Sequence, residues 1–326
     1  MKRMHWVLIG CLGAAITSCQ TSSSMDQVVS QTFVHKYGFD VSEKEWEQRD
    51  QDGQVVTVLK NGVKITYSYD NGQLHGPTTH TFPNSNVVEK LLVYDQGNLL
   101  KQMTNDVNGM PIREEIYEFD DRTITTLWDD KGAPLSIEEY DDEILVEGKY
   151  YTSGHELEAQ VEGGFGERVM RDRSGLLVER GTVENGVIAS RMTYHPSGQT
   201  HTVSHYHDYQ LHGEQLKYTT AGKPLMKLNW NHGVLDGLKI VFRNGYKVAE
   251  IPYIEGQKHG TELHYDDMGN LTAEVQWRND KKHGSSKFYN EETNETEWFF
   301  NGQTVSADKF QSLDSREKII AEFSAD

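Results

Sequence analysis

The sequence predicts an all-β protein: an extended array of antiparallel β-hairpin repeats, about eleven units of 21–24 residues, with short helical caps. Three observations predict this fold. Glycines recur at a fixed period, apolar and polar residues alternate between them, and an aromatic residue stands at a fixed place in the unit. A sequence period of about 20 to 50 residues is typical of stacked structural units.

Two series of glycines define the repeat. The first steps by 24, 23 and 24 residues through Gly198, Gly222, Gly245 and Gly269, and continues backwards through Gly175, Gly154, Gly132, Gly109, Asn86 and Gly62. The second steps by the same intervals through Gly213, Gly237, Gly260 and Gly284, with Gly76 as an earlier member. Glycine adopts positive φ without steric cost, so we expect two turns per unit.

Aromatic residues stand seven residues before the second glycine of a unit, at Tyr69, Tyr206, Trp230, Tyr253 and Trp277. Apolar and polar residues alternate before the aromatic, as at 226–230, and again after the glycine, as at 214–218. A period of two indicates a strand with one apolar face, and two such strands separated by a turn form a hairpin.

The segment 253–265 reads Tyr-Ile-Glu-Gly-Gln-Lys-His-Gly-Thr-Glu-Leu-His-Tyr and resembles the variant MORN repeat of YwqK-type antitoxin-like proteins. The resemblance is strong at 194–290 and 67–82. It is weak at 100–190, where Arg122 and Glu143 stand at glycine positions. It implies consecutive antiparallel hairpins laid side by side, and it implies no catalytic residue.

A histidine-glycine pair recurs in the units. Gln-Leu-His-Gly occurs at 73–76 and 210–213, and Lys-His-Gly at 258–260 and 282–284. We expect His212 to pack on the turn of the neighbouring repeat, so that such histidines form a ladder along one edge. The alternative is a histidine row that binds metal or senses pH. Asp236 replaces the histidine in one repeat, which weakens that alternative.

The first residues have the features of a bacterial export signal. Lys2 and Arg3 precede a short apolar run at 6–15, and Ile16-Thr17-Ser18-Cys19 resembles the lipobox of bacterial lipoproteins. That resemblance implies cleavage before Cys19 and acylation of Cys19. It therefore implies a chain held by the lipid bilayer of the cell envelope, at the inner or the outer membrane. An ordinary secretory signal and a cytoplasmic protein with an apolar start remain alternatives.

Two segments predict the helical caps. Ser42 followed by Glu45 has the spacing of a capping box and predicts a short helix near 42–49. Apolar residues at roughly helical spacing predict a helix within 307–324: Phe310, Leu313, Ile320 and Phe323. The expected organisation is a signal at 1–18, a lipidated linker and cap at 19–52, repeats at 53–306, and a C-terminal helix or tail at 307–326.

Composition argues against nucleic acid as a partner. The formal net charge is −18, and it becomes −20 without Lys2 and Arg3, because Lys and Arg fall from 32 to 30 against 50 Asp and Glu. Binding nucleic acid or anionic headgroups requires a basic face. The only other cysteine is Cys11 in the signal, so we expect no disulfide and no thiol chemistry in the mature chain.

Three stretches contain residues that could form a metal-binding or catalytic site. On a strand His201, His205 and His207 share one face, as zinc ligands can, but the alternation places them on the polar face. Residues 104–109 with Glu115 approach the spacing of a calcium loop, although Thr104 holds the first ligand position. The acidic run 138–143 is expected to be a solvated face. We therefore predict no catalytic residue, metal or cofactor.

The function expected from these features is that of a non-enzymatic repeat scaffold, anchored to a bacterial membrane, that binds a protein or an envelope polymer. The family resemblance supplies a first alternative, an antitoxin-like binder that neutralises a partner protein. A second alternative is an envelope hydrolase that uses acidic residues of the middle region.

Overall fold

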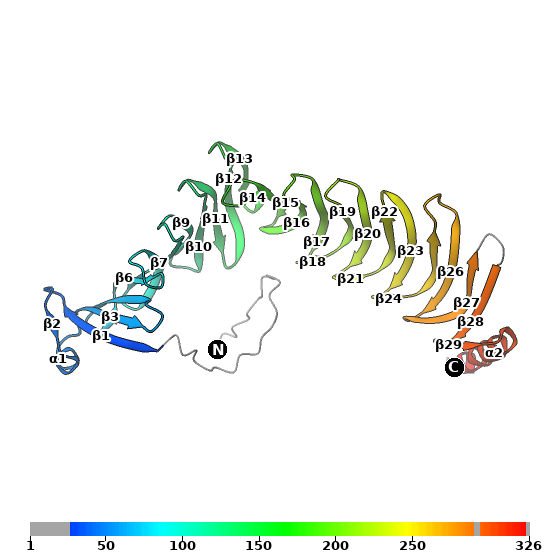
Figure 1. Ribbon diagram of the computed structural model, residues 1–326, viewed down its shortest axis with the longest axis horizontal. Coiled ribbons are helices and arrows are strands. Elements are labelled where there is room, and N and C mark those ends of the chain that lie inside the picture. Colours follow the sequence, from blue (N-terminus) through cyan, green and yellow to red (C-terminus); the bar gives the residue numbers. More distant parts are fainter. Residues whose placement is uncertain (1–26, 290–293, 324–326) are drawn as a thin grey trace. The chain divides into compact units, whose positions relative to one another are not determined.

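The computed structural model describes residues 27–289 and 294–323 (Figure 1). Within this range 29 antiparallel strands form one open sheet, accompanied by two helices. Strands adjacent in the chain pair with each other, so the predicted all-β array of hairpins with short helical caps is confirmed. Cys19 and the export signal lie outside the described residues.

The chain divides into two compact units, one reaching Leu100 with residues 107–109 added, the other comprising the rest. The elements of the first unit are β1 (Val28–His35), β2 (Asp40–Val41), α1 (Glu43–Gln48), β3 (Gly53–Leu59), β4 (Lys64–Asp70), β5 (Gln73–Leu74), β6 (Gly76–Thr81) and β7 (Val88–Asp95). Strand β8 (Asn98–Asn105) contributes residues to both units.

The second unit contains β9 (Pro111–Tyr117), β10 (Arg122–Trp128), β11 (Pro134–Asp141), β12 (Ile144–Tyr151), β13 (Leu157–Glu162), β14 (Phe165–Arg171), β15 (Leu177–Glu184), β16 (Val187–Tyr194), β17 (Thr200–His207), β18 (Gln210–Leu211), β19 (Gly213–Tyr218) and β20 (Pro224–Asn231). It continues with β21 (Val234–Leu235), β22 (Gly237–Arg243), β23 (Tyr246–Ile254), β24 (Gln257–Lys258), β25 (Gly260–Tyr265), β26 (Leu271–Arg278), β27 (Lys281–Tyr289), β28 (Asn294–Phe300), β29 (Gln303–Val305) and α2 (Ala307–Phe323).

Helix α1 forms where the capping box predicts it. The Ser42 hydroxyl accepts a hydrogen bond from the Glu45 backbone N–H, and the Glu45 side chain accepts one from the Ser42 N–H. Trp46 is buried, with its ring centroid 5.7 Å from Phe33 and 6.0 Å from Tyr69. Strands β1 and β2 also lie within 19–52, where the sequence predicts only a linker and cap; β1 pairs along β3.

Many hairpins close through two-residue turns, and only one of these turns, at Gly245, contains a member of the two glycine series. In each turn both central residues have positive φ, as type I′ turns require. Such turns stand at 71–72, 96–97, 120–121, 142–143, 163–164, 185–186, 208–209, 232–233, 244–245, 255–256, 279–280 and 301–302. Eight of the twelve turns contain a glycine, but in seven of them that glycine belongs to neither series, and the other four turns contain no glycine.

The second glycine series occupies bulges, not hairpin tips, and this corrects the expectation. Tyr206 pairs with Leu211, and Thr202 pairs with Lys217. The five residues 202–206 on β17 are therefore matched by the seven residues 211–217 on the paired segment, which contains two extra residues. The extra residues lie at His212 and Gly213, where φ of the glycine is +79°. The φ values at Gly76, Gly237, Gly260 and Gly284 are likewise positive.

The first series does mark turns, in most members at the left-handed residue of a longer hairpin loop. At Gly198 the His195 N–H donates to the Gln199 carbonyl and the Gly198 N–H to the His195 carbonyl. Gly222 and Gly269 follow the same pattern, and Gly245 lies in a two-residue turn. Two members are displaced, because His155 rather than Gly154, and Asn84 rather than Asn86, has positive φ.

Four of the five repeat aromatics lie opposite a glycine of the preceding strand. The registered pairs are Gly53 with Tyr69, Gly213 with Trp230, Gly237 with Tyr253, and Gly260 with Trp277. Each of these four glycines has a positive φ, a backbone conformation that favours glycine.

Apolar residues of successive strands point to opposite faces of the sheet. Leu228 on β20 pairs with Gln215 on β19, whereas Leu216 pairs with Lys227. Directly opposite residues share a face, so Leu228 and Leu216 lie on different sides. Leu228 is buried and Leu216 is half-buried. Each face of this single layer thus alternates apolar and polar rows.

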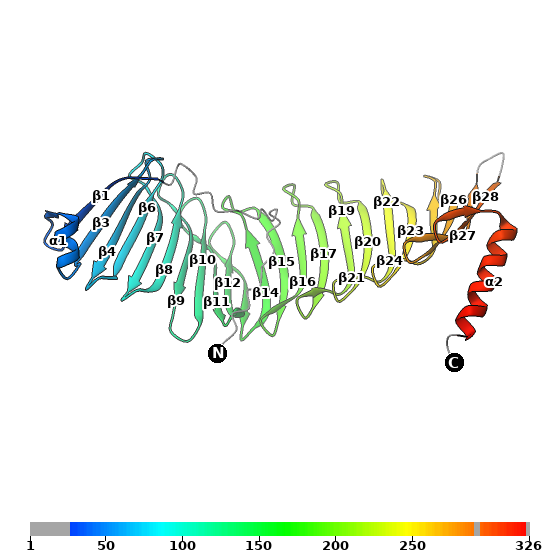
Figure 2. The same cartoon turned by 90° about the horizontal axis from the view of Figure 1, so that it is seen from below.

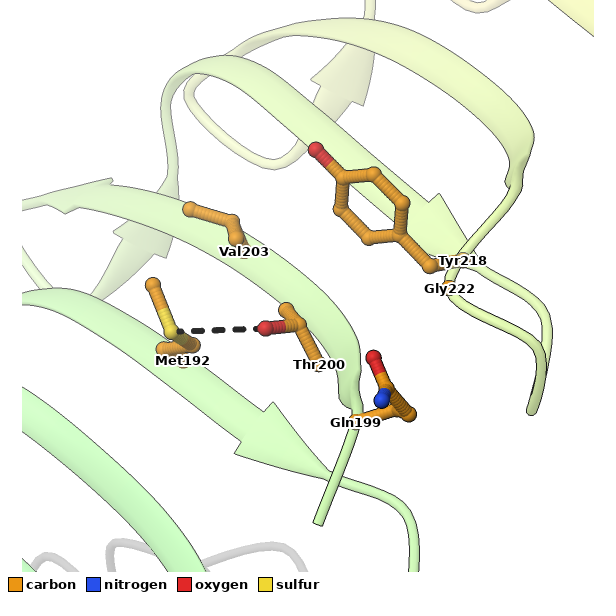
Figure 3. A pocket seen from close by; sticks show the side chains of 6 residues that line it. All are labelled: Met192, Gln199, Thr200, Val203, Tyr218 and Gly222. Atoms are coloured by element: carbon orange, nitrogen blue, oxygen red, sulfur yellow. Dashed lines mark hydrogen bonds between the residues drawn. The ribbon is translucent and has the colours of Figure 1, made fainter. Parts of the chain in front are cut away.

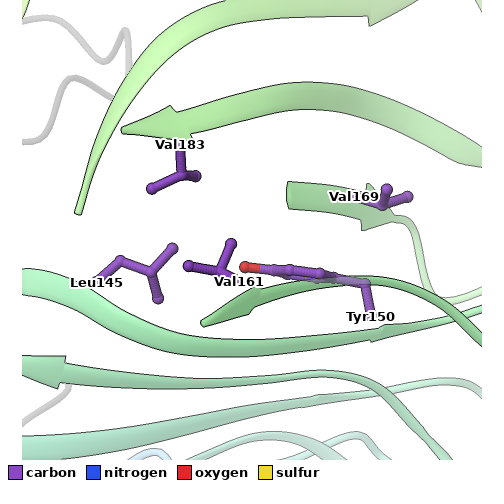
Figure 4. Packing of buried hydrophobic residues seen from close by; sticks show 5 residues of the cluster. All are labelled: Leu145, Tyr150, Val161, Val169 and Val183. Carbon is purple, nitrogen blue, oxygen red and sulfur yellow. The ribbon is translucent and has the colours of Figure 1, made fainter. Parts of the chain in front are cut away.

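A compact apolar cluster lies in β12–β15. It consists of Leu145, Tyr150, Val161, Val169 and Val183, whose side chains converge in Figure 4. Backbone bonds draw these strands together, because the Gly164 N–H donates to the Val146 carbonyl and the Gly186 N–H to the Gly164 carbonyl. Full burial of such side chains contributes roughly 1.5–3 kcal/mol each.

Helix α2 lies beside β28, near the C-terminal end of the sheet (Figure 2). Its Phe310 ring is centred 5.1 Å from that of Trp298 and 6.2 Å from that of Phe300. The predicted helix is therefore present, and Phe310 near its start packs against the sheet. Ile320 and Phe323 are exposed.

The Asp208–Tyr209 turn offers a test of these backbone assignments. Tyr209 has a φ of +63° and is 71% exposed. Tyr209→Gly should raise the free energy of unfolding by roughly 0.5–1 kcal/mol, because it removes left-handed strain and little contact. Thermal unfolding followed by circular dichroism measures this. Met268→Gly is the control, because Met268 is 88% exposed and does not have positive φ. This change should not raise the free energy of unfolding.

Candidate functional site

The histidine of each histidine-glycine pair contacts the turn region of the next hairpin. His75 Nδ1 lies 3.2 Å from Asp95 Oδ1, and the rings of His212 and His232 are 4.9 Å apart. Nδ1 of His259 lies 3.1 Å from Asn279 Oδ1, and Nδ1 of His283 lies 3.2 Å from Asn301 Oδ1. This edge of the sheet carries the histidine ladder that the sequence predicts.

A backbone hydrogen bond accompanies each of these side-chain contacts. The carbonyl just before the histidine-glycine pair accepts an N–H from the second residue of the next two-residue turn. The bonds run from Gly97 to Leu74, Gly233 to Leu211, Asp280 to Lys258, and Gly302 to Lys282, at 2.8–3.0 Å. A matching bond runs from Gly256 to Leu235 in the repeat where Asp236 replaces the histidine. Each hairpin tip is thereby fixed by the hairpin before it.

The three histidines with a zinc-like arrangement do not converge on one point. His201, His205 and His207 are exposed, as the polar-face assignment predicts. The His201 ring lies beside that of His195, with centroids 4.4 Å apart and planes tilted by 50°, and His205 Nδ1 lies 2.9 Å from the Glu214 carbonyl oxygen. His207 Nδ1 instead lies 3.2 Å from an Asp208 carboxylate oxygen. Each ring therefore has its own local partner.

The residues with calcium-like spacing serve a turn and a strand. Asp106 Oδ1 accepts the Met110 N–H, and Arg173 donates to Asp106 Oδ2 at 3.0 Å. Glu115 lies on β9 and accepts hydrogen bonds from Arg113 and Tyr117. The last contact, together with burial as its main cause, raises the pKa of Tyr117 to about 12. These carboxylates are directed at neighbouring donors and not at a shared centre.

The acidic run 138–143 contains a buried carboxylate, which corrects the expectation of a solvated face. Glu138 on β11 is only 3% exposed. Arg168 on β14 donates to both of its oxygens, at 2.6 and 3.2 Å. The phenols of Tyr140 and Tyr150 donate at 2.7 and 2.9 Å. Sequence reasoning misses this centre, because its acid and base stand 30 residues apart.

The electrostatics of this centre follow from its contacts. Burial acts to raise the pKa of Glu138, but the hydrogen bonds and charge of Arg168, together with the two phenols, outweigh it and hold the pKa below its ordinary value. Burial and the nearby Glu138 charge raise the pKa of Tyr140 and Tyr150. At neutral pH the centre therefore holds an anion, a cation and two neutral donors.

Further ion pairs extend from this centre across β13–β16. The pairs are Arg168–Glu179, Arg191–Glu179, Arg171–Glu158, Arg180–Glu158 and Arg180–Glu167, at 2.6–3.4 Å. Wherever the pKa of a described carboxyl departs from its ordinary value it is lowered, as at Glu45, Asp52, Asp129, Glu138, Asp172, Glu250, Asp266 and Asp314. The general acid of a glycosidase needs a raised pKa instead.

A shallow pocket opens between β16, β17 and β19 (Figure 3). Its volume is about 310 Å³, at the lower end of the range for ligand pockets. Met192, Val203 and Tyr218 supply its apolar lining. The polar lining comes from Gln199 and from Thr200, whose hydroxyl lies 3.8 Å from the Met192 sulfur. Its apolar lining beside an amide and a hydroxyl suits one side chain or sugar ring.

Comparison with known proteins identifies no family. No family model and no curated protein matches the chain. Solved structures that share some similarity are a mutant of TarM from S. aureus (TM-score 0.19, 8% identity, covering 35% of this chain and 21% of that one), TcdB2-TccC3 without its hypervariable C-terminal region (0.18, 13%, 73% and 16%), and BamB from Moraxella catarrhalis (0.14, 13%, 76% and 82%).

This chain spans about a fifth or less of the length of the first two of these structures. At such scores the similarities carry no inference about fold or function. Among the described residues, neither helix is long and apolar enough to cross a membrane.

The Glu138 centre generates a stability prediction. Glu138→Gln should lower the free energy of unfolding at pH 7 by about 3 kcal/mol, because it leaves the Arg168 charge buried without its main partner. Urea unfolding measures the loss. Glu139→Gln is the matched control; Glu139 pairs with the exposed Arg122, and the change should cost within about 0.5 kcal/mol.

The pH dependence of the parent protein follows with a defined sign. The folded-state pKa of Glu138 lies below its unfolded value, so its stabilisation is complete above the ordinary value of 4.5 and is lost as pH falls through the lower folded pKa. In the Glu138→Gln variant, the free energy of unfolding should therefore fall less as the pH is lowered. An unchanged pH profile would contradict the assigned role.

Proposed function

We propose that this chain is a lipid-anchored, non-enzymatic repeat scaffold of the bacterial envelope that binds a protein partner through the face of its sheet. The observation that carries the proposal is the single-layer sheet of the second unit, in which half-buried apolar rows alternate with polar rows on both faces. Repeat sheets and solenoids typically bind through such long, periodic surfaces.

The pocket at Met192, Val203 and Tyr218 gives this surface a local anchor point. Hot spots of protein interfaces are commonly side chains inserted into small apolar pockets. Methionine is flexible and polarisable, so a pocket wall formed by Met192 can adapt to more than one inserted group. An aromatic or aliphatic side chain of a partner protein fits this lining.

The chemistry of the acidic residues favours binding over hydrolysis. Glu138 is surrounded by hydrogen-bond donors, and Glu158 and Glu179 are each shared by two arginines. Carboxylates committed in this way hold strands together. A hydrolase acid needs a proton at neutral pH, whereas the lowered pKa of Glu138 keeps it ionised.

The anchor in this proposal rests on the sequence around Cys19. Acyl chains on that cysteine would tether the sheet to a bilayer. Each buried methylene of the chains contributes about 0.8 kcal/mol to membrane binding.

Whole-repeat deletions test the binding surface. Deleting 213–236 joins His212 to Gly237 and keeps the histidine-glycine pair, but removes Tyr218 and Gly222 from the pocket. Deleting 237–259 joins Asp236 to Gly260 and spares every pocket residue. Crosslinked capture from the cell's own membranes should recover one partner with the parent and the second variant, and about tenfold less with the first.

Two results would contradict this prediction. Equal recovery with both deletions would exclude the pocket region as the anchor. Absence of any protein partner of the parent chain would contradict protein binding and leave an envelope polymer as the ligand.

Substitution of Cys19 tests the anchor separately. Cys19→Ala should move the protein from the membrane pellet to the soluble fraction, because the acyl acceptor is lost. Immunoblotting of fractions and mass spectrometry of the N-terminal peptide measure this. Retention of the variant in the pellet, with an unmodified N-terminal peptide in the parent, would refute the lipid anchor.

A further inference from the structure

Helix α2 meets the last histidine-glycine repeat at a cluster of three potential metal ligands. One ligand atom from each of His283, Asp314 and Glu317 lies within 4.8 Å of the other two. His283 belongs to β27, and both carboxylates belong to α2. The cluster therefore joins the sheet to the helix that follows it.

The imidazole of His283 is held in the orientation that a metal ligand requires. Its side chain is only 9% exposed, between the rings of Phe300 and Phe310 at 5.0 and 5.3 Å. Nδ1 lies 3.2 Å from Asn301 Oδ1, to which it donates when Nε2 is unprotonated, and 3.3 Å from the Asn301 backbone N, whose N–H donates to it in the other tautomer. A histidine ligand generally donates its second nitrogen to an oxygen in this way, which fixes the ring and its tautomer.

The other ring nitrogen lacks a hydrogen-bond partner. Nε2 of His283 is buried and faces Asp314, with Oδ1 of that residue 3.7 Å away, beyond hydrogen-bonding distance. A buried polar atom without a partner is costly unless a ligand or ion completes it. The counterpart His212 has an unpartnered Nδ1 as well, but no carboxylate cluster surrounds it in the described part of the chain.

The neighbouring cations hold the outer sides of the two carboxylates. Lys318 pairs with Asp314 Oδ2 at 3.0 Å, so Oδ1 remains directed at His283. Arg278 donates to Glu317 Oε2 at 2.7 Å and to Asn301 Oδ1 at 2.9 Å. A carboxylate has two oxygens. Asp314 and Glu317 can therefore each keep one oxygen paired with the neighbouring cation while the other oxygen binds a metal.

We propose that His283, Asp314 and Glu317 bind a divalent transition-metal ion of the zinc type. Imidazole and carboxylate together suit zinc, whereas calcium and magnesium prefer oxygen ligands alone. Zinc–ligand bonds are about 2.0–2.2 Å, so the three ligand atoms need to contract only modestly, and water completes a tetrahedral site. The bound ion would fasten α2 to the sheet, independently of any partner of the scaffold.

Zinc titration of the full-length chain tests the proposal. After removal of metals with a chelator, zinc chloride should bind with one dominant site by isothermal titration calorimetry and should raise the melting temperature. Asp314→Asn and His283→Gln should each weaken zinc binding by about tenfold or more. Asp314→Asn nearly preserves side-chain shape, so it separates loss of a ligand from loss of packing.

His212→Ala is the matched control, because it removes the equivalent histidine of an earlier repeat and leaves the cluster intact. It should bind zinc like the parent. Parent affinity in both cluster variants, or no zinc binding by the parent at micromolar concentrations, would overturn the proposal. Loss of binding in His212→Ala with retention in Asp314→Asn would place the zinc elsewhere and overturn it equally.

Discussion

The hydrogen bond between successive hairpin tips is the constraint on which the repeats depend. In each case a turn N–H donates to the carbonyl that precedes the histidine-glycine pair of the hairpin before it. That carbonyl is available because the chain bulges at the pair, as at His212 and Gly213. The bulge, the turn and the strand register therefore depend on one another, and the histidine side chain adds a further contact at the same edge of the sheet.

A single layer of sheet must stabilise itself without a second apolar layer. In the histidine-glycine repeats it does so through cross-strand pairs, such as Leu228 with Gln215 and Leu216 with Lys227, which place apolar groups on both faces. In β11–β15 it also forms the apolar cluster around Tyr150 and the buried Glu138–Arg168 centre. Strong local packing there contrasts with half-buried apolar rows elsewhere, and those rows are the surfaces through which we propose that the scaffold binds its partner.

The candidate sites differ in how visible they are in sequence. The histidine ladder is predictable, because one residue type repeats at the period of the fold. The burial of Glu138 is not visible in the sequence, because nothing in the acidic run 138–143 distinguishes Glu138 from the neighbouring Glu139. The cluster at His283 combines a repeat histidine with Asp314 and Glu317 of a helix, and 31 residues separate the histidine from the first of them. Pairing over such distances is a product of folding.

The sequence by itself determined the class of fold, the repeat period and both helical caps, because these depend on local chemistry: alternation, positive-φ residues and the Ser42–Glu45 capping box. Only the tertiary structure decided which glycines lie in bulges, which face each apolar row occupies, and which charges are buried. The reason is register. A shift of one residue reverses every side chain of a strand, and that choice is made between strands, not within one.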